Sequence, residues 1–213
     1  MPPGKLVDLM LNEPPGPPDS VRQLLEDGRG AQLVAQFGDE DAVELRSAIA
    51  HRYDVSISQV LLGHGSGPLL NDMASWIVRR AIIHSPIRIA RHLAKKSGYP
   101  VVTTEFTYGK VTAAASRRGY QLIQLPMPPD ADGRFRLDLD LLDEALSRRP
   151  GWVYIVSPNN PTGQVIVEPT DLRRIVVGHR DSKFWIDEAY EGYLAPGRER
   201  ATSLVAGLDN VLQ

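Results

Sequence analysis

Short apolar runs alternate with segments of helical periodicity along most of the chain. The runs are rich in β-branched and aromatic residues and are expected to form strands at residues 60–62, 101–104, 121–125, 152–157 and 183–187. Before them, Ala42, Leu45 and Ile49 lie at helical spacing. Asp39 is placed to cap this helix. Strands that alternate with helices indicate an α/β fold with three layers, α/β/α, around a mostly parallel sheet.

A proline-rich segment precedes these elements. Proline disfavours helix interiors and central strands, so residues 1–35 are predicted to form an extended N-terminal arm and residues 36–213 a single large domain. The segment has too many prolines and acids for a secretory signal, and no apolar run is long enough to span a membrane. A cytoplasmic protein is therefore expected.

The overall charge and the lack of cysteine narrow the chemistry. The chain has 213 residues, a net charge of -2 and a pI near 6.2, so it has no electrostatic reason to bind nucleic acid or an anionic membrane. A small anionic ligand is compatible with this charge. Because no cysteine is present, disulfides, thiolate metal ligands and thiol nucleophiles are excluded, and no metal site is predicted.

A glycine turn at residues 63–68, GHGSGP, is the first of three junctions that follow predicted strands. Parallel sheets bind ligands beyond the carboxyl ends of their strands, so candidate chemistry is sought at these junctions. Glycines let a phosphate approach the backbone at the start of the following helix, and the hydroxyl of Ser66 adds a donor. An ordinary glycine-rich turn between strand and helix is the simpler alternative.

The other two junctions are a rigid loop and a carboxylate. The run SPNNPTG at residues 157–163 surrounds paired asparagines with two prolines and a glycine, which would fix the direction of an amide side chain. Asp187 ends an apolar strand, where burial of a carboxylate is costly unless a cation meets it. A surface turn and a helix-capping aspartate are the simpler alternatives.

Together these motifs resemble the class I and II aminotransferases of pyridoxal-phosphate fold type I. Asp187 follows Gly163, which closes SPNNPTG, by 24 residues and begins a D-x-x-Y motif that ends at Tyr190. The runs NEPPGPP, ELRSAIAHRYDV and VLLGHGSG are most similar to the histidinol-phosphate aminotransferase branch. The resemblance covers the chain from about residue 12 to its end. It implies the large cofactor-binding domain of that fold, with the C-terminal small domain absent.

The cofactor implied by this resemblance is pyridoxal 5'-phosphate. The resemblance implies that Gly65, Ser66 and Gly67 hold its phosphate, in agreement with the anion site suggested by the glycine turn. Tyr108, in the run EFTYG, would stack on the pyridine ring.

The implied catalytic residues are Asp187 and Tyr190. Asp187 would pair with the pyridine nitrogen, while Asn160 and Tyr190 would bind the phenolic oxygen. A carboxylate that keeps the ring nitrogen protonated makes the ring an electron sink. The implied reaction moves an amino group between an amino acid, such as histidinol phosphate, and a 2-oxo acid, and the implied assembly is a homodimer.

The sequence departs from the family at three places. The Schiff-base lysine is expected roughly thirty residues beyond Tyr190, whereas the chain ends at Gln213, so the chain alone is expected to be inactive. Phe37 stands where the family has a tyrosine that reaches the neighbouring subunit's cofactor phosphate. Residues 79–98 are basic and suit an amphipathic surface helix or a contact with a phosphate, a nucleic acid or a partner.

Two other functions stay open at this point. An amino-acid-phosphate decarboxylase of the same fold shares the SPNNPTG and D-x-x-Y motifs. A non-catalytic regulatory protein that binds the cofactor would suit a chain that ends before the lysine. It has no physical need, however, to retain Tyr108, Asn160, Asp187 and Tyr190 together.

Overall fold

The computed structural model describes residues 16–36, 38–39, 41–72 and 100–213. The chain divides into two compact units, Met1–Ile57 and Ser58–Gln213, which we call the first and the second unit. The arm predicted from the sequence ends at residue 35, whereas the first unit extends to Ile57. Phe37 and the basic segment 79–98 lie outside the described residues.

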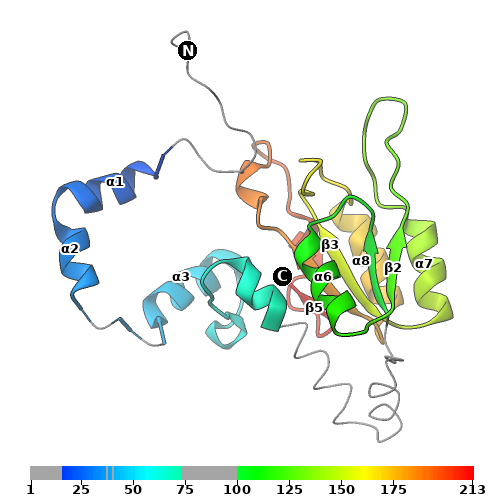
Figure 1. The fold of residues 1–213 in the computed structure, drawn as a ribbon, viewed down its shortest axis with the longest axis horizontal. Helices are drawn as coiled ribbons and strands as arrows, with labels where there is room; N and C mark the ends of the chain where they lie inside the picture. The colour runs from blue at the N-terminus through cyan, green and yellow to red at the C-terminus, as the bar shows by residue number, and fades with distance from the viewer. Residues whose placement is uncertain (1–15, 37, 40, 73–99) are drawn as a thin grey trace, which may run out of the picture. The chain divides into compact units, whose positions relative to one another are not determined.

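The first unit contains helices where the sequence predicted an extended arm. Helix α1 (Asp19–Glu26) follows the proline-rich run, and α2 (Arg29–Val34) follows Gly28, which adopts a φ of +78° (Figure 1). Pro18 has extended backbone at the N-cap of α1, and the acidic Asp19 lies in the first turn. The extended conformation is therefore wrong for these residues, because proline disfavours helix interiors but is compatible with helix starts.

The predicted capped helix is α3 (Val43–Tyr53), which begins later than expected. Ala42 occupies the N-cap in a left-handed conformation, with φ 43°. Asp39 still supports the helix start, because its carboxylate accepts hydrogen bonds from the backbone N–H groups of Asp41 at 3.1 Å and of Val43 at 2.8 Å.

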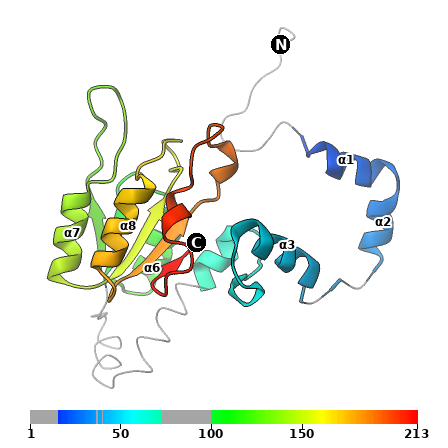
Figure 2. The same ribbon diagram turned by 180° about the vertical axis from the view of Figure 1, so that it is seen from behind.

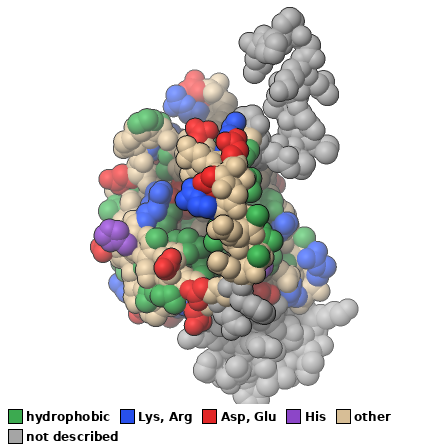
Figure 3. All heavy atoms as spheres, turned by 90° about the vertical axis from the view of Figure 1, so that its left-hand side faces the viewer, with side chains coloured by type: hydrophobic (Ala, Val, Ile, Leu, Met, Phe, Trp, Pro, Cys, Tyr) green, Lys and Arg blue, Asp and Glu red, His purple; other side chains and the backbone are tan. Residues whose placement is uncertain are grey.

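The helices of the first unit expose large apolar side chains. The exposed fractions are 63% for Leu25, 55% for Leu33, 88% for Val34 and 55% for Leu45. On the face of the molecule drawn in Figure 3, hydrophobic side chains lie among acidic and basic ones. Of the apolar residues predicted at helical spacing, Ala42 thus lies outside α3 at its N-cap and Leu45 is exposed.

The second unit is built on a parallel five-stranded sheet, as predicted. Its order is β2-β1-β3-β4-β5, and every neighbouring pair is parallel. The strands are β1 (Val101–Thr104), β2 (Leu122–Leu125), β3 (Trp152–Val156), β4 (Lys183–Asp187) and β5 (Val211–Leu212).

Two strand predictions differ from the structure. Residues 60–62 form no strand, and Leu61 is 71% exposed, so this apolar run lacks the burial that would select an extended pairing. Strand β5 has only two residues, too few for a sequence pattern, and it joins the sheet beside β4 through a hydrogen bond from Phe184 N to Asn210 O at 2.7 Å.

Helices cover both faces of this sheet. Helix α6 (Gly109–Arg117) lies on one face, and α7 (Leu139–Arg148) and α8 (Pro169–Gly178) lie on the other (Figures 1 and 2). Alternate residues of β3 separate the two cores: Val153 and Ile155 pack with α7 and α8, while Tyr154 packs with α6. The three-layer α/β/α prediction is confirmed.

The join between β1 and β3 is shorter than the other central pairings. Only Val101 and Val102 pair with β3, opposite Trp152 and Val153, whereas β3 and β4 pair over five positions. Beyond that point the hydroxyl of Thr103 donates to the Tyr154 carbonyl at 2.8 Å. The strand order reverses between β1 and β3, so this is the switch point at which such sheets open a ligand crevice.

Among the helices of the described ranges, none combines the length and the apolar character that crossing a bilayer requires.

Candidate functional site

Asp187 ends β4 on the face of the sheet that carries α6, and both of its carboxylate oxygens accept hydrogen bonds. The hydroxyl of Tyr154 donates to Oδ2 at 2.9 Å, and Ala189 N donates to Oδ1 at 3.1 Å. Burial, followed by the adjacent Asp187 carboxylate, raises the pKa of Tyr154 well above its ordinary value, so the phenol keeps its proton. Its ring packs edge-on against Trp185, with centroids 5.4 Å apart. These contacts fix the direction of the carboxylate.

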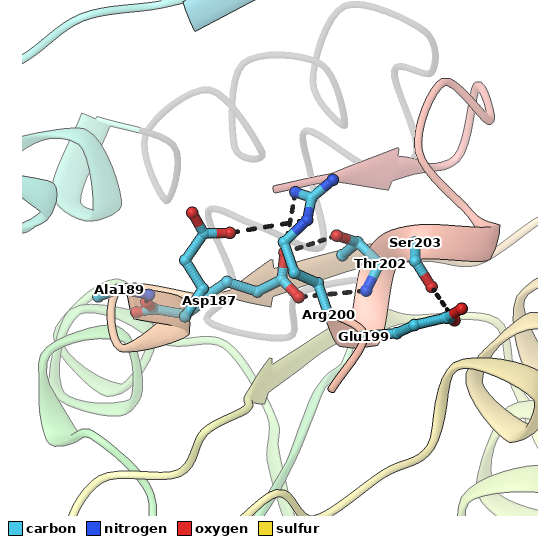
Figure 4. A network of polar contacts seen from close by, with 8 residues as sticks. Asp187, Ala189, Glu199, Arg200, Thr202 and Ser203 are labelled. Atoms are coloured by element: carbon cyan, nitrogen blue, oxygen red, sulfur yellow. Dashed lines mark hydrogen bonds and ion pairs between the residues drawn. The ribbon is translucent and has the colours of Figure 1, made fainter. Parts of the chain in front are cut away.

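The neighbouring Glu188 anchors this strand end to the short helix η3 (Ala201–Leu204). Its carboxylate accepts from Thr202 N at 3.1 Å and from Thr202 Oγ1 at 2.5 Å (Figure 4). Arg200 lies 3.7 Å from Glu188 and also 3.7 Å from Glu191. Burial raises the pKa of Glu188 even though Thr202 and Arg200 act to lower it. Two successive carboxylates thus differ in role: Asp187 belongs to the candidate site, and Glu188 holds the backbone beside it.

The loop at residues 157–163 is held by the first of its two asparagines. Asn159 donates through Nδ2 to Thr162 Oγ1 at 3.0 Å and to Phe106 O at 2.9 Å, which joins this loop to the loop after β1. Asn160 is half-buried and takes no part in these contacts. The Ser157–Pro158 and Asn160–Pro161 peptide bonds are cis. The sequence predicted a cofactor contact for Asn160. In the structure its neighbour Asn159 forms the hydrogen bonds that hold the loop.

Tyr108 lies on the same face of the sheet as Asp187. It precedes α6 with extended backbone and packs against the apolar cluster that contains Tyr154 and Trp185. Two residues earlier, Phe106 has a φ of 51°, a conformation that is strained for a non-glycine residue and that the bond from Asn159 helps to hold. The loop that positions Tyr108 is therefore tied to the loop that carries Asn160.

The glycine turn has the local geometry that its sequence suggests, although no strand precedes it. Gly65 has a φ of +76°, and residues from Ser66 onward are helical. A Cβ at Gly63 would lie 2.6 Å from Leu69 Cγ, and a Cβ at Gly67 would lie 2.7 Å from Lys110 Nζ. The turn therefore packs closely against the Leu69 side chain at Gly63 and against the Lys110 ammonium at Gly67.

Tyr190 starts the short helix η2 (Glu191–Tyr193) and is half-buried. Its ring lies against that of Tyr193, with centroids 6.0 Å apart. Only two residues separate it from the end of β4, so it belongs to the same edge of the sheet as Asp187.

Three of the four buried hydroxyls without partners in the described part of the chain lie at the carboxyl edge of the sheet, the fourth being that of Tyr120 before β2. Across the residues that the structure describes, the hydroxyls of Thr104, Thr107 and Ser157 find no hydrogen-bond partner. They end or follow β1 and β3, the two strands at the switch point. Unpaired buried polar atoms are costly, so this edge suits a polar ligand. A pyridine ring with a phosphate fits the set, because Asp187 can meet a protonated ring nitrogen and the cavity that Gly67 helps to line can take an anion.

Sequence reasoning missed three residues that shape the site. Tyr154 carries its signal in the sequence, since a phenol inside an apolar strand needs a buried acceptor. Lys110 directly follows the run EFTYG but belongs to no motif. Thr202 carries no local signal, because its role depends on a carboxylate 14 residues earlier in the chain.

The sequence of the chain is similar to those of a known enzyme family. Residues 4–212 match the family model described as aminotransferase class I and II. The chain is 31% identical over 180 residues to a histidinol-phosphate aminotransferase of an Anaeromyxobacter species, covering 84% of this chain and 44% of that protein. The chain spans about half the length of the curated relatives it matches.

Two solved structures have the same fold. Histidinol-phosphate aminotransferase from Sinorhizobium meliloti, solved in complex with pyridoxal-5'-phosphate, has a TM-score of 0.66 and 23% identity, covering 92% of this chain and 47% of that one. L-threonine-O-3-phosphate decarboxylase from Porphyromonas gingivalis has a TM-score of 0.63 and 17% identity, covering 92% of this chain and 50% of that one. At these identities the structural likeness establishes the fold alone.

Proposed function

The chain belongs to the class I and II aminotransferase family, and from this premise we propose that its second unit binds pyridoxal 5'-phosphate for amino-group transfer. The single observation that carries the proposal is the oriented carboxylate of Asp187. It lies at the carboxyl end of β4 with one donor on each oxygen, on the same face as Tyr108. A carboxylate held in this way is suited to meet a protonated ring nitrogen.

The proposed pocket uses residues from four segments. Gly65, Ser66 and Gly67 would hold the phosphate, and Tyr108 would stack on the ring. The remaining proposed contacts are those of Asn160 and Tyr190 with the phenolic oxygen and that of Asp187 with the ring nitrogen. The fixed loop around Asn159, the unpaired hydroxyls at the strand ends and the cavity that Gly67 helps to line support this arrangement.

Each residue contributes a distinct part of the chemistry. When bound, the cofactor supplies an electron sink for the pair left at the substrate Cα after its proton departs. Asp187 would keep the proton on the ring nitrogen, and Tyr154 and Ala189 N would hold that carboxylate in place. Tyr190 and Asn160 would bind the phenolic oxygen and so set the tilt of the ring.

For the whole protein we propose amino transfer between histidinol phosphate and a 2-oxo acid. The sequence relatives favour this reaction over decarboxylation of an amino-acid phosphate, whereas the fold alone does not separate the two. Incubation of the whole protein with histidinol phosphate and a 2-oxo acid, with detection of the new amino acid, tests the assignment. Release of carbon dioxide from an amino-acid phosphate, without amino transfer, would replace it with the decarboxylase.

A homodimer is part of the proposal for the whole protein. Every helix of the first unit exposes large apolar side chains, of which Val34 is the most exposed, and such surfaces suit burial against another subunit. Light scattering after size exclusion tests this, and a monomer at the highest soluble concentration would contradict it.

The pocket itself is tested by titrating the purified chain with pyridoxal 5'-phosphate and following absorbance and fluorescence. Saturable binding is expected, weakened about tenfold or more in Asp187→Ala because the ring nitrogen loses its anionic partner. Asp181→Ala, which removes an exposed carboxylate, is the matched control and should bind like the wild type. A folded sample without saturable binding would sink the cofactor assignment.

A further inference from the structure

Lys110 places a cation between the glycine turn and the candidate stacking residue. Its Nζ would lie 2.7 Å from a Cβ at Gly67, so the absence of a side chain at Gly67 is what lets the ammonium approach the turn. The same Nζ is 5.9 Å from the centroid of the Tyr108 ring. Lys110 therefore joins two segments that are far apart in sequence.

A cavity of about 280 Å³ lies at this point. It is lined by Gly67 and Asn71 from one helical segment and by Gly109, Lys110, Ala113 and Arg117 from α6. Lys110 and Arg117 are exposed, and they are seven residues apart on α6, two turns along the same face. Both charged side chains that line the cavity are cations.

Among the residues that the structure describes, no carboxylate pairs with the Lys110 ammonium. The first turn of α6 contains no acidic residue, and within the described ranges the Lys110 ammonium lies near the Tyr108 ring without an ion pair. An ammonium beside a side-chain-free stretch of backbone offers a phosphate monoester a charge-assisted hydrogen bond.

We propose that Lys110 is a ligand of the cofactor phosphate and supplies positive charge that the glycine turn alone does not provide. The inference rests on the proposed function and deepens it, because it adds a residue outside the recognised motifs to the same pocket. Lys110 reaches the turn from the helix that begins directly after Tyr108, so one short segment contacts both the ring and the phosphate.

The test compares two ring compounds that differ only in the phosphate, pyridoxine 5'-phosphate and pyridoxine. Neither carries an aldehyde, so neither can form an imine with a surface lysine. Dissociation constants are measured by fluorescence for the wild type and for Lys110→Met, Lys110→Arg and Arg148→Met. The last variant removes an exposed cation on α7 and is the matched control for charge.

Lys110→Met is expected to raise the dissociation constant of pyridoxine 5'-phosphate about tenfold at low salt. It should leave that of pyridoxine unchanged. Lys110→Arg should restore most of the affinity, and Arg148→Met should alter neither constant. If folded Lys110→Met bound both compounds more weakly to the same extent, or bound both as the wild type does, the inference would be overturned and the proposed function would stand. If the wild type bound neither compound, the inference and the proposed function would both be refuted.

Discussion

The bond between Thr202 and Glu188 allows a sharp test of how the end of β4 is held. Thr202 is fully buried, and its hydroxyl donates to the Glu188 carboxylate. Thr202→Val keeps the shape of the side chain and removes only the donor. Glu188 retains the bond from Thr202 N and the Arg200 guanidinium at 3.7 Å, so the carboxylate is weakened but not left without partners.

The expected loss is about 2 kcal/mol in the free energy of unfolding, since hydrogen bonds to charged groups contribute about 1.5–3 kcal/mol. The loss should shrink as the pH falls, because the hydroxyl acts to lower the pKa of Glu188 by stabilising its charged form. Urea denaturation at two pH values measures both effects.

Ser203→Ala is the matched control for this loss. The Ser203 hydroxyl binds an exposed carboxylate, Glu199, at 3.1 Å (Figure 4), so its removal should change the free energy by no more than about 0.5 kcal/mol. If Thr202→Val lost no more than this control, the anchoring role of Glu188 would be refuted.

Three further changes test other contacts. Burial raises the pKa of Glu188, so the stability that the neutral carboxyl contributes at low pH is lost as the pH rises through its native pKa. Glu188→Gln cannot ionise, so its free energy of unfolding relative to the wild type should rise from about pH 4 to about pH 8. A difference between the two proteins that does not change with pH would contradict this. Tyr154→Phe removes the buried donor to the Asp187 carboxylate and should lower the free energy of unfolding, measured by urea denaturation, by about 1.5 kcal/mol. A loss under about 0.5 kcal/mol would mean that this hydrogen bond contributes little. Gly63→Ala places a Cβ 2.6 Å from Leu69 Cγ and should lower the midpoint of thermal unfolding, with a cost of about 1–3 kcal/mol; an unchanged midpoint would show that Leu69 moves aside freely.

Most of the sheet could be predicted from the sequence because its strands are apolar runs buried on both faces. All five residues of β3 and four of the five residues of β4 are buried, so the apolar sequence pattern and the burial agree. Residues 60–62 have a similar composition but are not buried, since Leu61 is exposed and its two neighbours are half-buried. Composition alone does not reveal which runs find a partner strand. The helices of the first unit were missed because proline was weighed as a breaker and not as a residue that tolerates helix starts.

The candidate site was predicted where it depends on local motifs and missed where it depends on distant partners. Asp187 and the loop at 157–163 follow recognisable strands, so their place at the sheet edge follows from topology. Lys110 and Thr202 meet their partners only in the folded chain. No spacing rule links such positions, so the sequence could not indicate them.

The short join between β1 and β3 has a consequence for how the sheet opens. The β2-β1 pair lies within residues 101–125 and the β3-β4-β5 set within residues 152–212, so each block is continuous in sequence. Separating the blocks breaks few backbone pairings, whereas separating β3 from β4 breaks a ladder of five. The crevice that suits a ligand thus lies along a join with few backbone pairings. A ligand bound by the loops after β1 and β3 would hold the two blocks together and raise the free energy needed to open the sheet between them.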